Sequence, residues 1–227
     1  MSSAKNKPAD RPLLIFDLDG TLMDTRRDIA TAVNLMRKEY GLLPLPLDTI
    51  TGYVGDGIQE LVRRSLADRP GTDIGEATRI CATRYSEHLH DETLPYPGVR
   101  EGLEKLRAAG YALAMVSNKP GALCRTLLEH FGIMHLFDCV LGGGDTQNLK
   151  PHPEPLVLAV RKTGATAAGS WMIGDHRTDL EAARRAGLPG IFLTHGMGKT
   201  GTEKPAAVLH TFDELTAYLL ARKGLSE

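Results

Sequence analysis

The chain has few cysteines and almost no net charge. Its 227 residues include three cysteines, Cys81, Cys124 and Cys139, and no Cys-x-x-Cys pair. An odd number of widely spaced cysteines argues against both a disulfide framework and a zinc site, and it fits a reducing compartment. Lysine and arginine number 27 against 28 acidic residues, which gives a net charge of −1 and argues against a broad basic surface for nucleic acid or an anionic membrane.

Long apolar segments are absent as well. No stretch reaches the roughly 18 apolar residues that are needed to cross a bilayer. The first twelve residues also contain no apolar core of a signal peptide. We therefore expect a cytoplasmic protein whose partners are small molecules, and neither nucleic acid nor a membrane. The length allows one large domain or a core with a smaller insertion, and both a monomer and a homodimer stay open.

Short apolar runs alternate with segments of helical periodicity along most of the chain. These runs cover residues 13–16, 112–116, 139–141, 171–173 and 191–193. Between the last four runs, apolar residues recur three or four positions apart, as on one face of a helix. Alternation of strand and helix is typical of a parallel sheet covered by helices. The sequence thus predicts an α/β fold with a Rossmann-like parallel sheet.

One interval departs from this alternation. Between residues 25 and 93 no run has the pattern of a buried strand, and apolar residues such as Ile29, Val33 and Met36 keep helical spacing. The segment Pro95-Tyr96-Pro97-Gly98 that follows has strong turn-forming chemistry. We therefore predict an inserted all-helical domain at 25–93 and an α/β core formed by 1–24 and 94–227.

The most informative local pattern follows the first apolar run. Asp17 and Asp19 stand one residue apart at the end of a predicted buried strand, and Gly20 and Thr21 follow at once. Aspartate is depleted in strands and costly to bury, so such a pair needs a positive partner, and a metal ion is the simplest one. Because ligands bind at the carboxyl ends of parallel strands, the pair indicates a reaction site. A lone Asp-Gly-Thr would more often be an ordinary turn.

Three further polar clusters follow predicted strands. Ser117 and Asn118 precede a helix, where a phosphate can be bound by side chains and by backbone N–H groups. Lys150 stands before prolines at the start of a helix, where an immobilised lysine can neutralise a phosphate or an aspartate. Asp175 follows a strand and Asp179 comes four residues later, where it can support a metal ligand. Taken singly, these clusters would more often be helix caps or a solvated lysine.

Together the four patterns resemble the motifs of the haloacid dehalogenase-like (HAD) superfamily. The resemblance rests on Asp17-Leu18-Asp19-Gly20-Thr21-Leu22-Met23-Asp24 for motif I, Ser117 for motif II, Lys150-Pro151-His152-Pro153 for motif III and Gly174-Asp175 with Asp179 for motif IV. His176 departs from the Ser or Asp usual at its position, and we expect it to be a surface or supporting residue. The resemblance extends over nearly the whole chain. It implies a HAD-type core with the helical insertion as a C1-type cap over the active site.

The resemblance also implies a phosphomonoester hydrolase that acts on a small phosphorylated metabolite through an aspartyl-phosphate. In such an enzyme Asp17 would be the nucleophile, and Asp19 would act as general acid and then as general base. Mg²⁺ would be held by Asp17, the backbone carbonyl of Asp19 and Asp175, with Asp179 in a supporting position. The transferring phosphoryl oxygens would be held by three residues, Ser117, Asn118 and Lys150.

Substrate choice has to come from the insertion, because the core motifs treat every phosphoryl group alike. Gly55 and Gly57 stand before a helical run and are able to present free N–H groups to an anion such as a carboxylate, although a flexible loop explains them equally well. This loop and the string Ser117-Asn118-Lys119-Pro120 resemble those of phosphoglycolate phosphatases. The resemblance implies 2-phosphoglycolate as substrate, hydrolysed to glycolate and phosphate.

Other interpretations stay open at the level of sequence. A phosphatase or mutase for sugar phosphates or pyrophosphate would share the core and the cap. A haloacid dehalogenase would use the same nucleophile but needs no acid and base at position 19, so Asp19 argues against it. A phosphoacceptor signalling domain also gathers aspartates, a hydroxyl and a lysine at strand ends. Such domains are much shorter and lack a helical insertion after the first strand.

Overall fold

A six-stranded sheet forms the centre of the protein, which is described here by a computed structural model over residues 11–223. Its strand order is β5-β4-β1-β6-β7-β8, and all paired neighbours run parallel. The strands are β1 (Pro12–Phe16), β4 (Ala112–Pro120), β5 (Cys139–Gly143), β6 (Thr166–Gly174), β7 (Gly190–Leu193) and β8 (Ala207–Leu209). The predicted α/β fold with a Rossmann-like parallel sheet is confirmed.

Strand β1 is apolar because both of its faces are buried. Leu14 and Phe16 point into one core cluster, whereas Leu13 and Ile15 point into the other. All four side chains are fully shielded from solvent. This alternation follows from the two-residue period of a strand, and a strand that is covered on both sides loses the polar positions of a half-exposed one.

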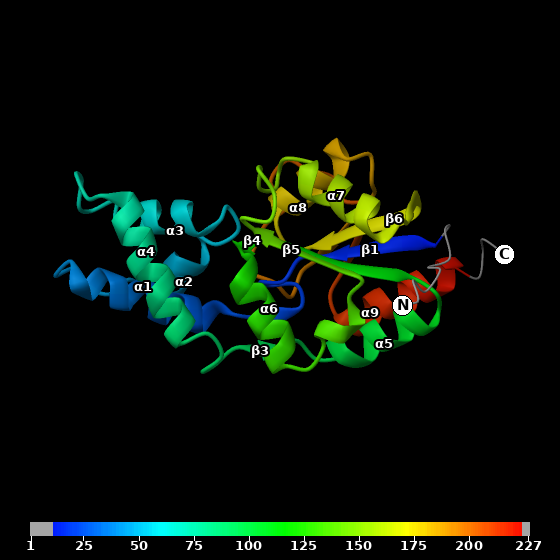
Figure 1. The fold of residues 1–227 in the computed structure, drawn as a ribbon, viewed down its shortest axis with the longest axis horizontal. Coiled ribbons are helices and arrows are strands. Elements are labelled where there is room, and N and C mark those ends of the chain that lie inside the picture. Colours follow the sequence, from blue (N-terminus) through cyan, green and yellow to red (C-terminus); the bar gives the residue numbers. More distant parts are fainter. Residues whose placement is uncertain (1–10, 224–227) are drawn as a thin grey trace, which may run out of the picture.

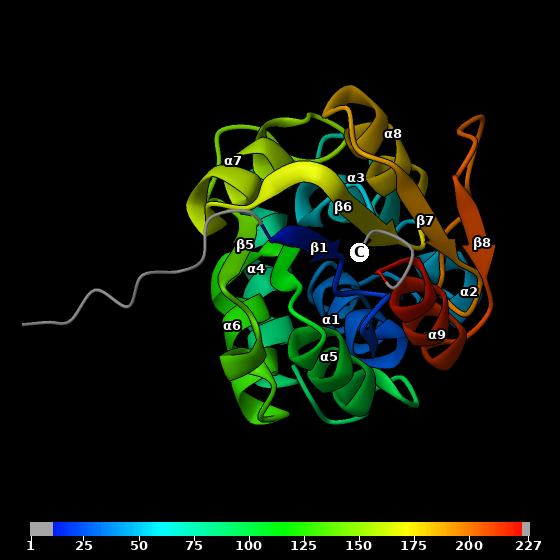
Figure 2. The same ribbon diagram turned by 90° about the vertical axis from the view of Figure 1, so that its right-hand side faces the viewer.

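Helices cover both faces of the sheet (Figure 2). On the Leu14 side they are α5 (Val99–Ala108), α6 (Gly121–His130) and α9 (Phe212–Lys223), with a single 3-10 turn at Met134–Leu136. On the Leu13 side they are α7 (Glu154–Thr163) and α8 (Arg177–Arg185). The result is a three-layered α/β core in which the carboxyl ends of the strands share one edge.

The insertion after the first strand is helical, as the sequence predicts. Its helices are α1 (Arg26–Glu39), α2 (Leu47–Thr51), α3 (Ile58–Ser65) and α4 (Ile74–Glu87). They lie together at one end of the molecule, beyond the edge of the sheet (Figure 1). A two-stranded antiparallel ladder of β2 (Met23–Asp24) and β3 (Leu94–Pro95) joins the two connections between the helices and the sheet. The division into a core and a cap domain stays a prediction.

Three strands escape sequence-based prediction, namely β2, β3 and β8. The first two have two residues each and β8 has three. Such short segments do not carry enough residues to show a two-residue period. Strand β4 extends beyond its apolar run through the polar residues of the candidate site, whereas β6 begins earlier than its run, at Thr166, with mostly exposed residues.

All three cysteines are buried, and within residues 11–223 none of them forms a disulfide. Burial raises the pKa of the Cys81 thiol to about 12, so this group stays protonated at neutral pH. Over residues 11–223, no helix is both long enough and apolar enough to span a bilayer.

Candidate active site

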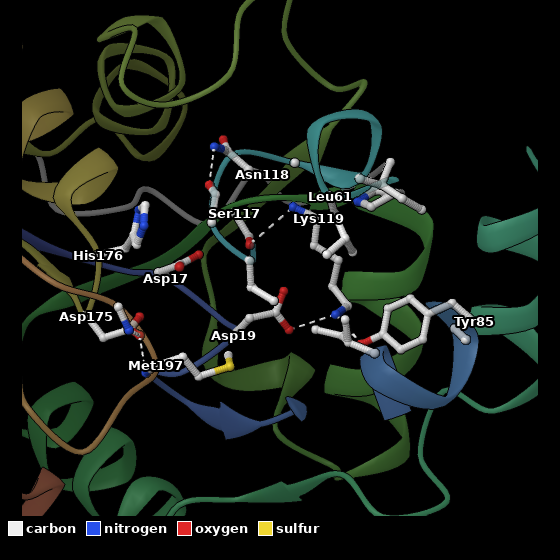
Figure 3. Close-up of a pocket in the computed structure, with 18 of the residues that line it drawn as sticks. Asp17, Asp19, Leu61, Tyr85, Ser117, Asn118, Lys119, Asp175, His176 and Met197 are labelled. Atoms are coloured by element: carbon white, nitrogen blue, oxygen red, sulfur yellow. Dashed lines mark hydrogen bonds and ion pairs between the residues drawn. The ribbon is translucent and has the colours of Figure 1, made fainter. Parts of the chain in front are cut away.

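The predicted core residues come together at one edge of the sheet (Figure 3). Asp17 and Asp19 follow β1, Ser117 lies near the end of β4, and Asp175 follows β6. All four line the same pocket, which also reaches the insertion helices α1, α3 and α4. Lys150, between β5 and α7, is buried directly beneath this pocket against Asp17. The structure therefore unites residues that are far apart in the sequence.

Lys150 is the central cation of the site. Its Nζ donates to Oδ1 of Asp179 at 2.7 Å and to the carbonyl of Val116 at 2.6 Å, and it lies 3.0 Å from Oδ1 of Asp17. Burial acts against the charge of this lysine, but the carboxylates of Asp17 and Asp179 raise its pKa above the usual value. The ammonium therefore remains charged in the interior and neutralises its carboxylate partners.

Three buried carboxylates form the negative part of the site. Single oxygens of Asp17, Asp175 and Asp179 all lie within 4.8 Å of one another. Burial raises the pKa of Asp17 to about 6 despite the charge of Lys150. Burial, together with the charges of Asp17 and Asp179, raises the pKa of Asp175 to about 8. Such values show that the cluster contains too little positive charge for its carboxylates, a deficit that a divalent cation with oxygen ligands would remove.

The individual oxygens of this cluster differ in how they are engaged. Among the described residues, Asp17 Oδ1 accepts no hydrogen bond of good geometry, although Lys150 lies 3.0 Å away. Asp179 is completely shielded from solvent, and it accepts from Lys150 and, at 3.0 Å, from the backbone N–H of His176. Asp17 Oδ1 is thus available to a hard cation, whereas both oxygens of Asp179 are already engaged in holding the lysine and the loop.

Asp175 is held in place by two loops, one of which donates backbone N–H groups and the other a side-chain hydroxyl. Its Oδ2 accepts from the N–H groups of Met197 at 2.7 Å and Gly198 at 3.0 Å, and its Oδ1 accepts from the Thr21 hydroxyl at 3.1 Å. Gly20 approaches so closely, with a φ of +81°, that a Cβ there would lie 2.2 Å from Asp175 Oδ2. The Gly-Thr of the first motif is therefore required both for the turn and for the contact with the second carboxylate.

Asn118 connects three loops through its side chain. Its Nδ2 donates to the carbonyls of Gly55 at 2.9 Å and Lys150 at 2.8 Å, and its Oδ1 accepts from the backbone N–H of Lys150 at 2.8 Å. The sequence predicts that Asn118 holds phosphoryl oxygens. In the structure its amide is engaged with backbone instead, so this side chain positions Lys150 and the insertion loop.

The loop of Gly55 and Gly57 lies at the mouth of the pocket. Gly55 has a φ of +118°, and a Cβ there would lie 2.7 Å from the ring of His176. Gly57 has a φ of +92° and immediately precedes α3. Between the two glycines, Asp56 forms ion pairs with Arg177 of α8 at 2.5 Å and with Arg64 of α3 at 2.7 Å. The two predicted glycines therefore do lie at the site, and charged contacts connect their loop to the core.

His176 forms one wall of the same pocket. Its Nδ1 accepts from the backbone N–H of Thr178 at 3.3 Å and lies 3.0 Å from the Thr178 hydroxyl. Burial lowers the pKa of His176 below its usual value, so the imidazole is neutral at pH 7. The histidine caps α8 and packs against the backbone of Gly55.

Lys119 is a site residue that the sequence analysis does not single out. Its Nζ lies 2.7 Å from Oδ1 of Asp19 and also donates to the hydroxyl of Tyr85 in α4. The same Asp19 oxygen accepts from the Thr25 hydroxyl at 2.7 Å. The lysine stands in the string Ser-Asn-Lys-Pro, but a lysine before a helix is usually solvated, so its burial could not be inferred from sequence spacing.

Comparisons with known proteins agree with this geometry. Residues 14–193 match the family model of haloacid dehalogenase-like hydrolases. A phosphoglycolate phosphatase of Nitrosospira multiformis is 42% identical over 188 residues, covering 81% of this chain and 83% of that protein. One of Psychrobacter arcticus is 36% identical over 222 residues, covering 93% and 96%.

A solved structure gives the same result at the level of the fold. The crystal structure of a predicted phosphoglycolate phosphatase from Haemophilus somnus superimposes with a TM-score of 0.86 and 32% identity, covering 92% of this chain and 97% of that one. The family model covers residues 14–193, and the relatives are similar in sequence as well as in fold. The chain therefore belongs to the haloacid dehalogenase-like hydrolases, as one of the phosphatases of that family.

Proposed function

We propose that this protein hydrolyses 2-phosphoglycolate to glycolate and phosphate through an aspartyl-phosphate at Asp17, with Mg²⁺ as cofactor. The observation that carries the proposal is the position of Asp17, a buried carboxylate that lines the pocket and has a charged lysine 3.0 Å from Oδ1. A carboxylate nucleophile for phosphorus needs such a cation, because the anionic ester repels it. The relatives named phosphoglycolate phosphatase support the choice of substrate.

Asp17, Asp175 and the backbone carbonyl of Asp19 would hold Mg²⁺. The raised pKa values of the two carboxyl groups support this assignment, since a bound divalent cation would compensate charges that burial leaves unpaired. When bound, Mg²⁺ stabilises negative charge on the phosphoryl oxygens as a Lewis acid. Asp179 would act as a supporting residue by fixing Lys150.

Asp17 acts as the nucleophile, and Asp19 acts as the general acid and then as the general base. Asp17 attacks phosphorus and the bond to the alcohol oxygen breaks, while Asp19 gives its proton to that oxygen. Asp19 then takes a proton from the water that opens the acyl phosphate. Thr25 and Lys119 both bind Oδ1 of Asp19, each at 2.7 Å, so Oδ2 is the atom that carries the proton.

The remaining residues bind the phosphoryl group and enclose it. Ser117 is buried in the pocket wall and would donate its hydroxyl to a phosphoryl oxygen. Lys150, whose ammonium already faces Asp17, Asp179 and the carbonyl of Val116, would offset the negative charge of the phosphoryl group from behind the nucleophile. We propose that the helices within residues 25–93 act as a cap. Ile29 of α1, Leu61 of α3 and Tyr85 of α4 line the pocket from this side, where they would exclude bulk water.

Steady-state assays on a panel of phosphate esters test the proposal. The panel contains 2-phosphoglycolate, glucose 6-phosphate, a nucleoside monophosphate and pyrophosphate, each with Mg²⁺. We expect kcat/KM for 2-phosphoglycolate to exceed the others at least tenfold, with release of inorganic phosphate in the absence of any sugar bisphosphate. A preference for a sugar phosphate or for pyrophosphate would refute the proposed substrate. A requirement for a bisphosphate would instead indicate a mutase.

A further inference from the structure

We propose that Lys119 recognises the carboxylate of the substrate and thereby selects short phosphorylated acids. This inference rests on the proposed function and deepens it, because it assigns to one side chain the choice among phosphate esters that the core motifs treat alike. Figure 3 shows the lysine in the pocket wall, between Asp19 of the core and Tyr85 of the insertion.

The charges that face the pocket give the first argument. Of the described residues in the pocket lining, Lys119 is the one lysine or arginine. The acidic members of the lining are Asp17, Asp19 and Asp175. A phosphorylated acid carries negative charge at both ends. Lys150 and the metal would serve the phosphoryl end, and Lys119 would serve the other end.

The unused hydrogen-bonding capacity of the ammonium gives the second argument. A lysine has three N–H donors, and in the described structure two of them are engaged, by Asp19 Oδ1 and by the Tyr85 hydroxyl. Lysine is ordinarily charged at neutral pH, and the ion pair of Lys119 Nζ with Asp19 Oδ1 at 2.7 Å keeps the group a cation. One charged donor therefore remains for a ligand in the pocket.

Around this donor the pocket is mostly apolar. The apolar lining comes from Ile29, Ala32, Val54, Ile58, Leu61 and Cys81. A carboxylate that enters such surroundings loses its hydration, and this loss is costly unless a charged partner replaces the hydrogen bonds to water. A neutral group needs no such partner, so the lysine would discriminate between an acid and a neutral ester of the same size.

The position of Lys119 also sets the length of the substrate. Its Nζ lies 2.7 Å from Asp19, the residue that would protonate the leaving alcohol oxygen. The carboxylate that the lysine binds must therefore lie close to that oxygen in the substrate. In 2-phosphoglycolate a single methylene group separates the two. An acid with one more methylene group would move its carboxylate away from the lysine, towards the apolar wall.

The closest alternative is that Lys119 only positions Asp19. In that case its loss would slow all phosphate esters equally, because every leaving group needs the acid. The test is therefore Lys119→Met, which keeps most of the length and volume of the side chain but removes the charge. It is assayed on 2-phosphoglycolate and on ethyl phosphate, which has the same leaving oxygen and the same number of carbons but no carboxylate. Lys105→Met, at an exposed position of α5, is the matched control.

We expect Lys119→Met to lower kcat/KM for 2-phosphoglycolate at least a hundredfold, mainly through KM, and for ethyl phosphate less than tenfold. Lys105→Met should change neither. Lys119→Arg should recover part of the preference for the acid. Equal losses on both esters, or no loss on either, would overturn the inference while the proposed function stands.

A comparison without any substitution keeps the inference testable if Lys119→Met does not fold. The parent protein should prefer 2-phosphoglycolate over ethyl phosphate at least a hundredfold, and over the homologous three-carbon acid, 3-phosphooxypropanoate, at least tenfold. Equal rates on the acid and on ethyl phosphate would overturn the inference. Failure of the parent protein to hydrolyse 2-phosphoglycolate would overturn both the inference and the proposed function, so the two failures are distinguishable.

Discussion

The amide of Asn118 donates a hydrogen bond of 2.9 Å to the carbonyl of Gly55, and this bond joins the end of a core strand to the loop of the helical insertion. The same side chain binds both the N–H and the carbonyl of Lys150. One asparagine thus sets the position of the lysine beside the nucleophile and of the loop at the mouth of the pocket. Both partners contribute backbone groups, so the arrangement depends on the side chain of residue 118.

We expect Asn118→Ala to lower kcat/KM by one to two orders of magnitude on every phosphate ester alike. The substitution leaves buried backbone groups of Lys150 without partners, which costs about 1–3 kcal/mol for each group. The midpoint of thermal unfolding should fall as well. A loss confined to 2-phosphoglycolate, with ethyl phosphate unaffected, would show that Asn118 contacts the substrate's carboxylate and does not act through Lys150.

Removal of metal should stop turnover, and Mg²⁺ should restore it. Asp175→Ala is expected to raise the Mg²⁺ concentration needed for half-maximal activity at least tenfold, because it removes one of the two carboxylates that would hold the cation. Calcium should bind but support little turnover, since its looser coordination relaxes the alignment of nucleophile and phosphorus. Activity is titrated with Mg²⁺ or Ca²⁺ after EDTA treatment, which measures the concentration needed for half-maximal activity and the maximal rate with each cation. Full activity in excess EDTA would refute the proposed metal site.

The stability of the metal-free protein should depend on pH through the same carboxyl groups. The pKa of Asp17 is raised to about 6 and that of Asp175 to about 8, from 3.8 for an ordinary aspartate. Between about pH 4 and pH 8 the folded state therefore binds more protons than the unfolded state, and the free energy of unfolding falls as the pH rises through this window. Mg²⁺ should stabilise the protein more at pH 8 than at pH 5, because its ligands must be ionised.

Thermal unfolding in EDTA across this pH range shows whether the stability of the metal-free protein falls as the pH rises. Asp175→Asn is the control, since it keeps the size of the side chain and removes the titrating group. The decline from pH 5 to pH 8 should be smaller in this variant than in the parent. Identical pH profiles for the two proteins would show that Asp175 does not have a raised pKa.

Substitution of Gly57 tests the loop of the insertion. Gly57→Val would force a β-branched residue to a φ of +92° and place its Cβ 3.0 Å from Leu149 Cδ1. We expect kcat/KM for 2-phosphoglycolate to drop tenfold or more, and that for an aryl phosphate to drop much less. Gly52→Ala, whose Cβ would meet only ordinary contacts at 3.5 Å, should leave both unchanged. Equal losses on both substrates would assign the loop to folding or closure.

The fold and the core of the site were predictable because their residues follow buried strands. Asp17 and Asp175 each come directly after an apolar run that is covered on both faces, and such runs are distinctive in sequence. Parallel pairing of β1 with β4 and β6 then brings the strand ends to one edge, so the proximity of these residues follows from the fold.

The contacts that join the core to the insertion were not predictable in this way. Lys119 binds Asp19 and Tyr85, and Asn118 binds the backbone of Gly55. These contacts depend on the directions in which the side chains point, and the spacing of apolar residues in the sequence does not predict those directions. The resemblance to the HAD motifs implies a phosphate contact for Asn118. The structure instead uses the amide to satisfy backbone groups, which must find partners wherever loops are buried.

The central claim is that Asp17 becomes phosphorylated, and Asp19→Asn gives the most direct test of it. This variant retains the nucleophile but lacks both the acid for the leaving alcohol and the base that activates water. The acyl phosphate should therefore form slowly and then persist when the protein is mixed with 2-phosphoglycolate and Mg²⁺. After an acid quench and borohydride reduction, mass spectrometry of the peptides should find homoserine at position 17, and Asp17→Asn should give none. The mechanism would be contradicted if the parent hydrolysed the substrate at its full rate while Asp19→Asn gave no homoserine at position 17. Turnover by Asp17→Asn within tenfold of the parent would contradict it as well.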